Sequence, residues 1–203
     1  MAYQQTRIEV QRVCAHVIAR ERHGRDGHIG LAWTGRGVGT DRLWLEGDGL
    51  HRPDGAVQPL TTLVDLAAFA GVDLEAPFSA GHDTPPLGDR GAPLAVDRAD
   101  LDRLLDFFAA VWPTLVDLAA GAPVTLWPEH FDAAFVRHER ANVGASPGDG
   151  FSDAPYLYVG PWGPERPGDP GYWNAGFGAF QPFSGRVDDT RTFLERGISL
   201  LET

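Results

Sequence analysis

The sequence predicts an α+β fold, in which antiparallel sheets pack against three or four helices. Apolar residues recur at helical spacing in 6–24, 97–120 and 188–201, which predicts helices there. Between these stretches lie short apolar runs separated by glycine and proline turns, the pattern of antiparallel strands. The chain has 203 residues, of which 43% are hydrophobic, enough for one sizeable core. We therefore expect a single domain over residues 1–203, with a weak division near 93–97 as an alternative.

The charge balance limits the partners of this chain. It carries 28 acidic residues against 17 basic ones, a formal net charge of −11, and every one of those basic residues is Arg. A field this negative repels nucleic-acid phosphates and anionic lipid surfaces. We therefore expect neither nucleic acid nor a membrane as partner, and we expect a small molecule. A homo-oligomer is compatible with the same composition.

The N-terminal segment and the cysteine content give information on the cellular compartment in which the protein resides. The first residues lack the apolar core of a signal peptide, and no run reaches the length of a membrane span. Cys14 is the only cysteine, so an intramolecular disulfide and a cysteine-rich zinc site are excluded. It falls on the apolar side of the first predicted helix, which indicates a buried, inert thiol. We expect a cytoplasmic location.

The first half of the chain reads as a helix followed by a sheet. Thr6 and Glu9 fit a capping box at the start of the helix, and Gly24 is a suitable end. Short runs between glycine turns in 27–59 predict an antiparallel meander of three or four strands. The glycine-rich segment 35–39 lacks the Lys-Ser/Thr ending of a phosphate-binding loop, so we interpret it as a link between strands.

Two further helices and a long loop follow. Thr61 or Thr62 can cap a short helix over Leu63–Ala70 that ends at Gly71. The segment 77–93 is rich in Pro, Gly and Asp without periodicity, which predicts a long loop. Its His82-Asp83 pair could reach a site, but a solvated loop pair is the favoured interpretation. The longest helix is expected over 97–120, capped by Asp97 and bent at Pro113.

The C-terminal third is predicted to be mostly strand. Tyr156 and Tyr158 alternate with Leu157 and Val159, which is strand patterning. The glycine- and aromatic-rich segment 172–180 is expected to form another strand. Asp188 and Asp189 then open the last helix, whose apolar stripe consists of Leu194, Ile198 and Leu201.

The stretch 123–138 places Glu129, His130 and Asp132 among apolar and aromatic residues. Buried ionisable groups need partners, so this cluster is either a site or a structural hydrogen-bonded network. A helix beginning at Pro128 is one interpretation. We favour a strand with Pro128 at an edge or bulge, because the residues before it read as extended. In a strand, His130 and Asp132 share one face and Glu129 lies on the other.

The His130-x-Asp132 spacing allows two kinds of chemistry. A carboxylate that orients an imidazole gives a general base with a fixed tautomer, with Glu129 as a second acid. The same two residues could instead be ligands of a divalent metal, which needs a third ligand from elsewhere. His138 is the only histidine downstream, which disfavours the spacing used by iron and 2-oxoglutarate oxygenases. The sequence therefore does not decide whether the protein binds a divalent metal or no cofactor.

Aromatic and polar residues near this stretch could line a ligand cavity, since small-molecule sites combine aromatic walls with a few polar tips. Core packing of the large aromatic side chains and loop capping by the polar ones are the alternatives. The expected ligand-binding residues are Trp127, Asn142, Asp149, Tyr156, Tyr158, Trp173 and Asn174. Asn142, Ser146 and Asp149 are expected on one loop framed by glycine and proline. Ser146 is not part of a G-x-S-x-G elbow, so it is a poor candidate nucleophile.

Four segments carry a resemblance to a known family. They are Leu126–Asp132 (LWPEHFD), Gly144–Asp149, Pro155–Trp162 and Trp173–Ala175. Here the chain resembles an uncharacterised bacterial family of unknown function, mainly actinobacterial, with an LWPxHFD-type motif. The resemblance covers mainly 123–180 and brings no established activity. Members can have His at the position of Glu129, which favours His130 and Asp132 as the shared site residues.

Two functions remain in competition on these grounds. The first is a small-molecule-binding protein, and in one version an enzyme, whose pocket combines His130, Asp132 and Glu129 with the aromatic strands. The second is a non-catalytic interaction or assembly protein that uses its Trp-, Tyr- and Pro-rich loops as a contact surface. Composition and motifs do not name a substrate or a reaction.

Overall fold

The computed structural model describes residues 2–81 and 83–202. Its fold class is α+β, as predicted, with two antiparallel sheets. The chain forms two compact units. Unit 1 consists of Met1–Asp106 and Leu126–Phe131, and unit 2 consists of Phe107–Thr125 and Asp132–Thr203. The chain thus passes from unit 1 to unit 2 within one helix, and it crosses twice more near the LWPEHFD motif.

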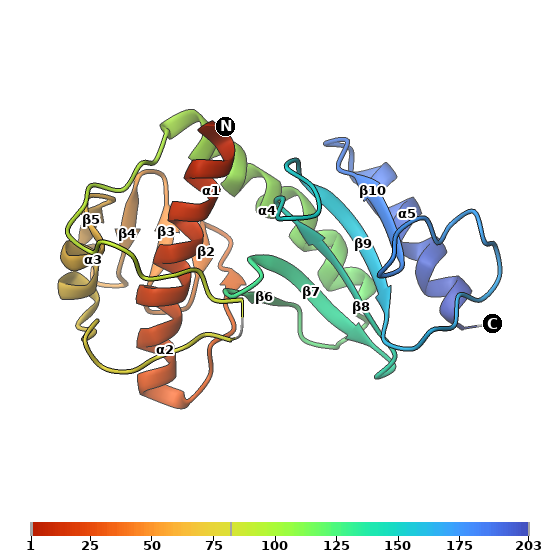
Figure 1. The fold of residues 1–203 in the computed structure, drawn as a ribbon, viewed down its shortest axis with the longest axis horizontal. Coiled ribbons are helices and arrows are strands. Elements are labelled where there is room, and N and C mark those ends of the chain that lie inside the picture. The colour runs from red at the N-terminus through yellow and green to blue at the C-terminus, as the bar shows by residue number, and fades with distance from the viewer. Residues whose placement is uncertain (1, 82, 203) are drawn as a thin grey trace. The chain divides into compact units, whose positions relative to one another are not determined.

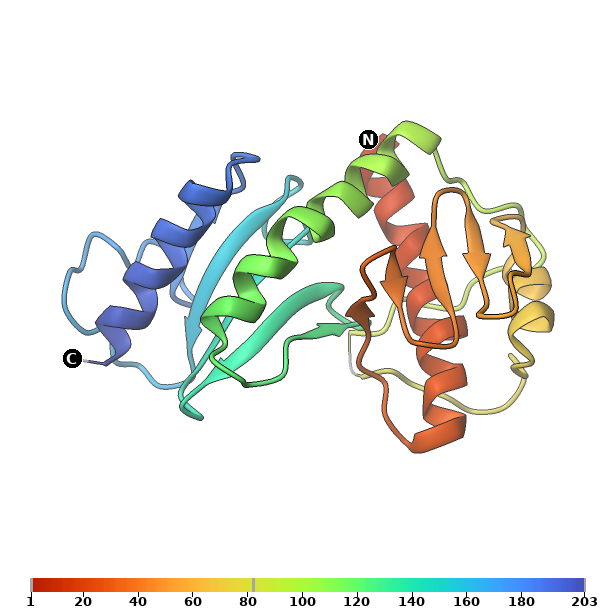
Figure 2. The same ribbon diagram turned by 180° about the vertical axis from the view of Figure 1, so that it is seen from behind.

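Unit 1 combines helices with a five-stranded sheet (Figure 2). Its helical elements are α1 (Ala2–Val13), the π-helical segment η1 (Cys14–Ile18), α2 (Ala19–Asp26), α3 (Leu63–Ala70) and the first part of α4 (Arg98–Leu118). Its strands are β1 (Ala32–Trp33), β2 (Val38–Gly39), β3 (Trp44–Glu46), β4 (Gly49–His51) and β5 (Val57–Pro59). Strand β6 (Thr125–Trp127) lies where the chain returns from unit 2.

The first helix differs from its prediction at both ends. It begins at Ala2 instead of at Thr6, and the Thr6 hydroxyl accepts a hydrogen bond from the backbone N–H of Asp97 at 2.9 Å. The capping-box prediction is therefore wrong, because a partner distant in sequence uses that oxygen. The helix continues past Gly24 and ends at Gly27, whose φ of +80° is the left-handed conformation of a helix C-cap.

The middle of this helix is a π-helical turn, η1. Its five residues are all buried, and burial raises the pKa of the Cys14 thiol. The prediction of a buried Cys14 is confirmed, and its protonated thiol is a poor nucleophile. The ring of His16, in the centre of the turn, is 4% exposed. Such turns widen the helix locally and often mark special sites.

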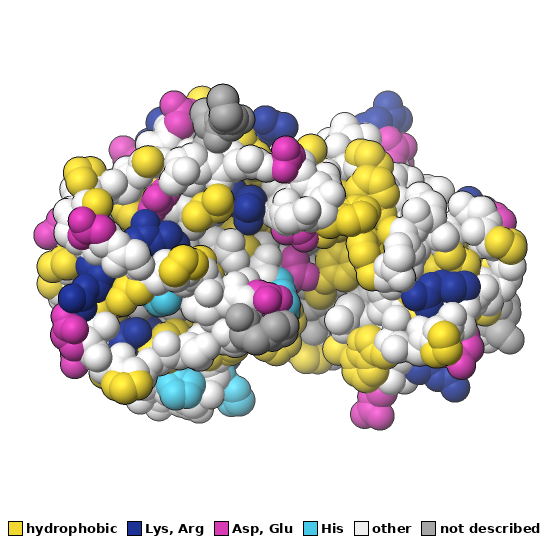
Figure 3. All heavy atoms as spheres, in the orientation of Figure 1, with side chains coloured by type: hydrophobic (Ala, Val, Ile, Leu, Met, Phe, Trp, Pro, Cys, Tyr) yellow, Lys and Arg dark blue, Asp and Glu magenta, His cyan; other side chains and the backbone are white. Residues whose placement is uncertain are grey.

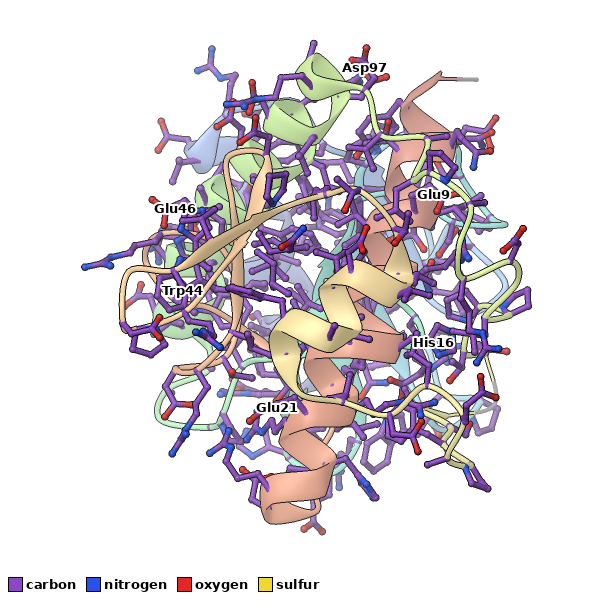
Figure 4. The ribbon with its side chains drawn as sticks, turned by 90° about the vertical axis from the view of Figure 1, so that its left-hand side faces the viewer. Glu9, His16, Glu21, Trp44, Glu46 and Asp97 are labelled. Carbon is purple, nitrogen blue, oxygen red and sulfur yellow. The ribbon has the colours of Figure 1, made fainter. Side chains whose placement is uncertain are left out.

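Three side chains on one stripe of the helix bind the backbone of residues 73–87, which include the first part of the long loop and the turn before it, and we call this the helix–loop contact. Arg12 donates to the carbonyl oxygen of Leu87, and the Nε2 atom of His16 lies 2.7 Å from the carbonyl oxygen of Pro85. Arg20 donates to the carbonyl oxygens of Asp73 and Ala76. The spacing of four residues places all three on one side of the helix, and Figure 4 shows His16 on the side that the loop covers. The helix thus holds the segment before the long loop at Asp73 and Ala76, and it holds the loop itself at Pro85 and Leu87.

The sheet of unit 1 is an antiparallel meander in the order β1-β2-β3-β4-β5. It has five strands where three or four were expected. Residues 35–37 of the glycine-rich segment link β1 to β2, as predicted, and its last two residues form β2 itself. A Cβ atom on Gly37 would lie 1.7 Å from the carbonyl oxygen of Leu45. Glycine is needed there because the neighbouring strand approaches so closely, so backbone packing accounts for these residues.

Helices α3 and α4 follow their sequence signals closely. The Thr62 hydroxyl accepts from the backbone N–H of Asp65 at 3.1 Å, and Gly71 closes α3 with a φ of +72°. The carboxylate of Asp97 accepts from the N–H of Asp100 at 3.0 Å at the start of α4, and Pro113 lies inside that helix. Both capping predictions are confirmed.

Unit 2 is a sheet with helices on one face. Its strands are β7 (Asp132–Arg137), β8 (Ala141–Ser146), β9 (Tyr156–Pro161) and β10 (Ala179–Pro182), in the antiparallel order β10-β9-β8-β7. Helix α5 (Val187–Leu201) and the second part of α4 lie on the same face (Figures 1 and 2). Leu157 and Val159 are buried, and the alternate residues Tyr156 and Tyr158 point to the other face.

The aromatic segment 172–180 departs from its prediction. Only Ala179 and Phe180 belong to β10, and the residues before them form a turn. The hydroxyl of Tyr172 donates to the carbonyl oxygen of Phe193 at 2.9 Å on α5. A Cβ atom on Gly197 would lie 2.2 Å from that hydroxyl oxygen. The strand prediction is wrong here because Tyr172 packs onto the helix.

Among the described residues, every helix is too short or too polar to cross a lipid bilayer.

Candidate functional site

The LWPEHFD motif does not form one continuous strand. Strand β6 ends at Trp127, Pro128–Phe131 is a turn, and β7 begins at Asp132. The backbone N–H of Phe131 donates to the carbonyl oxygen of Trp127 at 2.6 Å, and Phe131 has a φ of +57°. Strand alternation therefore does not hold across the turn. The prediction that His130 and Asp132 share a strand face is wrong, because a tight turn separates them.

Glu129 and His130 belong to unit 1, where the long loop meets them. The imidazole Nδ1 of His130 lies 3.3 Å from the carboxylate of Asp83, and both side chains are about half exposed. The carboxyl group of Glu129 packs against Gly81, and Gln11 donates to the backbone carbonyl of Glu129 at 2.7 Å. An ion pair this exposed contributes little to stability. The long loop reaches the motif through Asp83, where the sequence favours a solvated pair, and His82 lies outside the described residues.

Asp132 belongs to unit 2 and forms a hydrogen bond with Tyr158. The Tyr158 hydroxyl donates to Oδ2 of Asp132 across the intervening strand β8. Tyr158 is paired with Gly144 in the sheet, and a Cβ atom on Gly144 would lie 2.8 Å from Cζ of the Tyr158 ring. The missing side chain of Gly144 therefore lets the ring lie flat over β8 and reach Asp132 on β7.

A second phenol–carboxylate pair lies beside the first. The Tyr156 hydroxyl donates to Oδ2 of Asp149 at 2.5 Å, and the Tyr156 and Tyr158 ring centroids are 6.2 Å apart. The other oxygen of Asp149 accepts from the backbone N–H groups of Phe151 and Ser152, at 2.8 and 3.2 Å. Asp149 thus accepts hydrogen bonds from three donors.

Burial and the two carboxylates act together on the phenols. Burial, then Asp132, raises the pKa of Tyr158 well above its ordinary value. Burial, then the hydrogen bond to Asp149, raises the pKa of Tyr156. Both hydroxyl groups therefore keep their protons at neutral pH. The arrangement supplies neutral hydrogen-bond donors beside two carboxylate acceptors, and it does not supply a phenolate base.

Phenyl rings surround the two pairs. Phe151 makes edge-to-face contacts with Tyr156, Phe177 and Phe180, at centroid distances between 5.0 and 5.7 Å. Phe151 is 52% exposed and Phe177 is 37% exposed. Figure 3 shows hydrophobic side chains gathered over β9 and β10 on this side of the sheet. We call this surface the aromatic face, and its residues are Asp132, Asp149, Phe151, Tyr156, Tyr158, Phe177 and Phe180.

The aromatic face contains three of the seven residues expected to bind ligand, namely Asp149, Tyr156 and Tyr158, together with Asp132 from the expected catalytic set. Sequence reasoning did not single out Phe151 or Phe177, because neither lies in a regular strand or helix whose periodicity would set the direction of its side chain. Their only common feature is a preceding glycine in a turn segment.

The other expected ligand-binding residues have different surroundings. The indole N–H of Trp173 donates to the carbonyl oxygen of Pro167 at 2.8 Å. The amide of Asn174 exchanges two hydrogen bonds with the backbone of Phe180, at 2.9 and 3.0 Å. Trp127 is 38% exposed on β6, and Asn142 is exposed on β8, where it accepts from the indole of Trp162 at 3.2 Å. Trp173 and Asn174 stabilise the approach to β10.

The metal interpretation gains no third ligand. Within 2–81 and 83–202, no group of three or more His, Cys, Asp or Glu side chains is arranged to hold a metal ion. His138 pairs with Glu202 at 3.6 Å in unit 2. The side chains that contact these two residues are Asp83 for His130 and Tyr158 for Asp132.

No family model, curated protein or solved structure matches this chain. The residues of the aromatic face therefore have to be interpreted from their own geometry.

Proposed function

We propose that the chain is a small-molecule-binding protein and that the aromatic face is its binding surface. The ligand class is a planar aromatic compound that carries hydrogen-bond donors, such as amino or amidine groups. The observation that carries the proposal is the pair of adjacent phenol–carboxylate hydrogen bonds on the sheet face opposite α5, with phenyl rings around them.

The chemistry of the face favours this class of ligand. Asp132 and Asp149 are carboxylate acceptors, and a carboxylate oxygen that already holds one hydrogen bond can accept a second from a donor group of the ligand. Phe151 and Phe177 expose ring surface for stacking, which adds about 0.5–1.5 kcal/mol for a well-placed aromatic pair. The formal net charge of −11 attracts ligands of positive charge from solution. A binding role requires no ionised phenol, which agrees with the raised pKa values of Tyr156 and Tyr158.

The resemblance to the LWPxHFD-type family supports the same assignment. The last residue of the motif, Asp132, accepts the hydrogen bond from Tyr158. The segments Gly144–Asp149 and Pro155–Trp162, which also carry the resemblance, contain Gly144, Asp149, Tyr156 and Tyr158. We infer that the shared motifs build the aromatic face.

Titration with benzamidine tests the proposal, with benzoate as the anionic control of the same shape. Chemical shifts of the Tyr and Phe rings should move saturably with benzamidine and remain unchanged with benzoate. Asp132→Asn should weaken benzamidine binding at least tenfold, because a charge-assisted hydrogen bond contributes about 1.5–3 kcal/mol. Asp153→Asn, an exposed carboxylate in the same loop region, serves as the matched control and should leave binding unchanged.

A second variant separates binding from folding. Tyr158→Phe removes only the hydroxyl group and should lower the free energy of unfolding by about 0.5–1.5 kcal/mol, so the protein remains folded. Its benzamidine affinity should fall because Asp132 loses the donor that orients it. Saturable binding that is equal in the wild type and in both Asp132→Asn and Tyr158→Phe would place the ligand elsewhere and overturn the proposal.

A further inference from the structure

A separate hollow in unit 2 has the chemistry of a second binding site. Its volume is about 430 Å³, within the range of small-molecule sites. It shares no residue with the aromatic face. Its lining residues are Glu139, Arg140, Pro161, Trp162, Gly163, Glu165, Pro167 and Leu201. We call it the Trp162 hollow.

One wall of the hollow is the tip of the β7–β8 hairpin, which has an unusual backbone. His138 and Glu139 have φ values of +51° and +53°, a conformation that favours Asn-Gly in two-residue hairpin turns. Such residues persist where their surroundings hold them. Glu202 holds the tip of the hairpin in this conformation, because it forms ion pairs with Arg137 and, at 3.6 Å, with His138. The tip is thereby fixed with Glu139 in the wall of the hollow.

The opposite wall is also held in place. Trp162 is 59% exposed, yet its indole N–H donates to Asn142 at 3.2 Å and its backbone N–H donates to the carbonyl oxygen of Arg140 at 2.7 Å. The guanidinium of Arg166 donates to the carbonyl oxygens of Gly163 and Glu165, each at 2.8 Å. A large, exposed indole is therefore presented by a loop that is already ordered, which lowers the entropic cost of binding.

The charges around the indole favour a cation. Glu139 and Glu165 both line the hollow, and neither carboxylate forms an ion pair within the part of the chain that the structure describes. Two cationic side chains lie near these carboxylates: Arg140 in the lining, and Arg166, whose guanidinium binds two carbonyl oxygens of the same loop. Neither forms an ion pair with Glu139 or Glu165 in the described structure, so both carboxylates are available as counter-charges. The face of a Trp ring is the best aromatic partner for an ammonium group. The alkyl groups of an alkylammonium ligand would add apolar contacts with Pro161 and Pro167.

We propose that the Trp162 hollow binds small alkylammonium compounds, with the ammonium group over the indole of Trp162 and with Glu139 and Glu165 as counter-charges. This site is independent of the proposed function of the aromatic face, because the two surfaces use different residues and different probes.

Titration with tetramethylammonium tests the proposal, with tert-butanol as the neutral probe of similar shape. The indole N–H resonance of Trp162, assigned by its loss in Trp162→Phe, should shift saturably with tetramethylammonium. The indole resonance of Trp44, which lies in unit 1, serves as an internal reference, and tert-butanol should leave both resonances unchanged. Added salt should weaken the binding because exposed charges are screened.

Isosteric variants locate the counter-charges. Glu165→Gln and Glu139→Gln should each weaken tetramethylammonium binding by up to about fivefold, the range of a single exposed charge pair. Glu195→Gln, an exposed glutamate on α5 outside the hollow, should leave it unchanged. Both test positions are exposed, so the variants fold. The proposal is overturned by an absent or non-saturable Trp162 shift, by an equal shift with tert-butanol, or by unchanged binding in both test variants.

Discussion

The helix–loop contact of unit 1 and the aromatic face of unit 2 use buried polar side chains in opposite ways. In the helix–loop contact, Arg12, His16 and Arg20 bind backbone carbonyl oxygens of the segment 73–87. In the aromatic face, Tyr158 and Tyr156 bind the side chains of Asp132 and Asp149. A backbone carbonyl carries no net charge, and one hydrogen bond is enough to satisfy it. An ionised carboxylate carries a charge and can accept further hydrogen bonds.

If the aromatic face binds ligand as proposed, substitutions in the two regions should affect different properties. Loss of a side chain from the helix–loop contact leaves backbone carbonyl groups of the segment 73–87 without their donors, which destabilises the fold. Loss of one from the aromatic face should change ligand affinity more than stability. Three substitutions test this contrast, in addition to the binding experiments above.

The largest effect is expected for Arg20→Met. Arg20 is 9% exposed, donates to two carbonyl oxygens and places its guanidinium 4.8 Å from the centre of the Phe78 ring. Loss of two charged hydrogen bonds should lower the free energy of unfolding by about 3 kcal/mol, since each contributes roughly 1.5–3 kcal/mol before relaxation. Urea denaturation measures the change.

Arg36→Met is the matched control for Arg20→Met, because Arg36 is exposed and lies outside the helix–loop contact. It should shift the urea midpoint little. Equal effects of the two substitutions would show that the helix–loop contact does not stabilise the unit.

Gly144→Ala should lower the free energy of unfolding less than Arg20→Met does. It should also weaken ligand binding at the aromatic face. The new methyl group would meet the carbonyl oxygen of Ala133 at 2.5 Å and the Tyr158 ring at 2.8 Å. Overpacking of this kind costs about 1–3 kcal/mol. The Tyr158 ring should move away from Asp132, so benzamidine binding should fall together with stability.

Gly150→Ala is the control for Gly144→Ala, because a Cβ atom on Gly150 has no neighbour within 4 Å. Thermal unfolding and benzamidine titration of the two variants should differ clearly. If Gly144→Ala left both properties unchanged, the close approach of Tyr158 to β8 would be wrong.

The smallest effect is the pH dependence that His16 gives to the helix–loop contact. Burial lowers the pKa of His16, and the nearby Arg20 and Arg12 lower it further, against the hydrogen bond to Pro85. The unfolded chain takes up this proton near the ordinary imidazole pKa of about 6.5, before the folded chain does. Stability from a neutral His16 is therefore present above about pH 6.5 and is lost as the pH falls through the lower pKa of the folded state.

His16→Gln keeps a donor for the carbonyl oxygen of Pro85 and removes the titration. The urea midpoint of the wild type should fall more steeply than that of His16→Gln below about pH 6.5. Parallel pH profiles of the two proteins would contradict the assignment of this titration to His16.

Prediction from sequence succeeded where the signal is local. Thr62 with Gly71, and Asp97 at the start of α4, gave helix ends that the structure confirms. It failed at Thr6, whose hydroxyl is used by Asp97 from a distant part of the chain. It also failed in the LWPEHFD motif, where the positive φ of Phe131 ends the alternation that the strand interpretation required.

The sequence by itself determined the fold class, the helix boundaries set by local caps, the buried Cys14 and the negative charge, because these depend on composition and on residues a few positions apart. Only the tertiary structure decided that Asp132 meets Tyr158, that Asp149 meets Tyr156, and that His130 meets Asp83 instead of Asp132. Those contacts depend on strand register and on the space left by Gly144. Neither property is encoded in the spacing of the residues that touch.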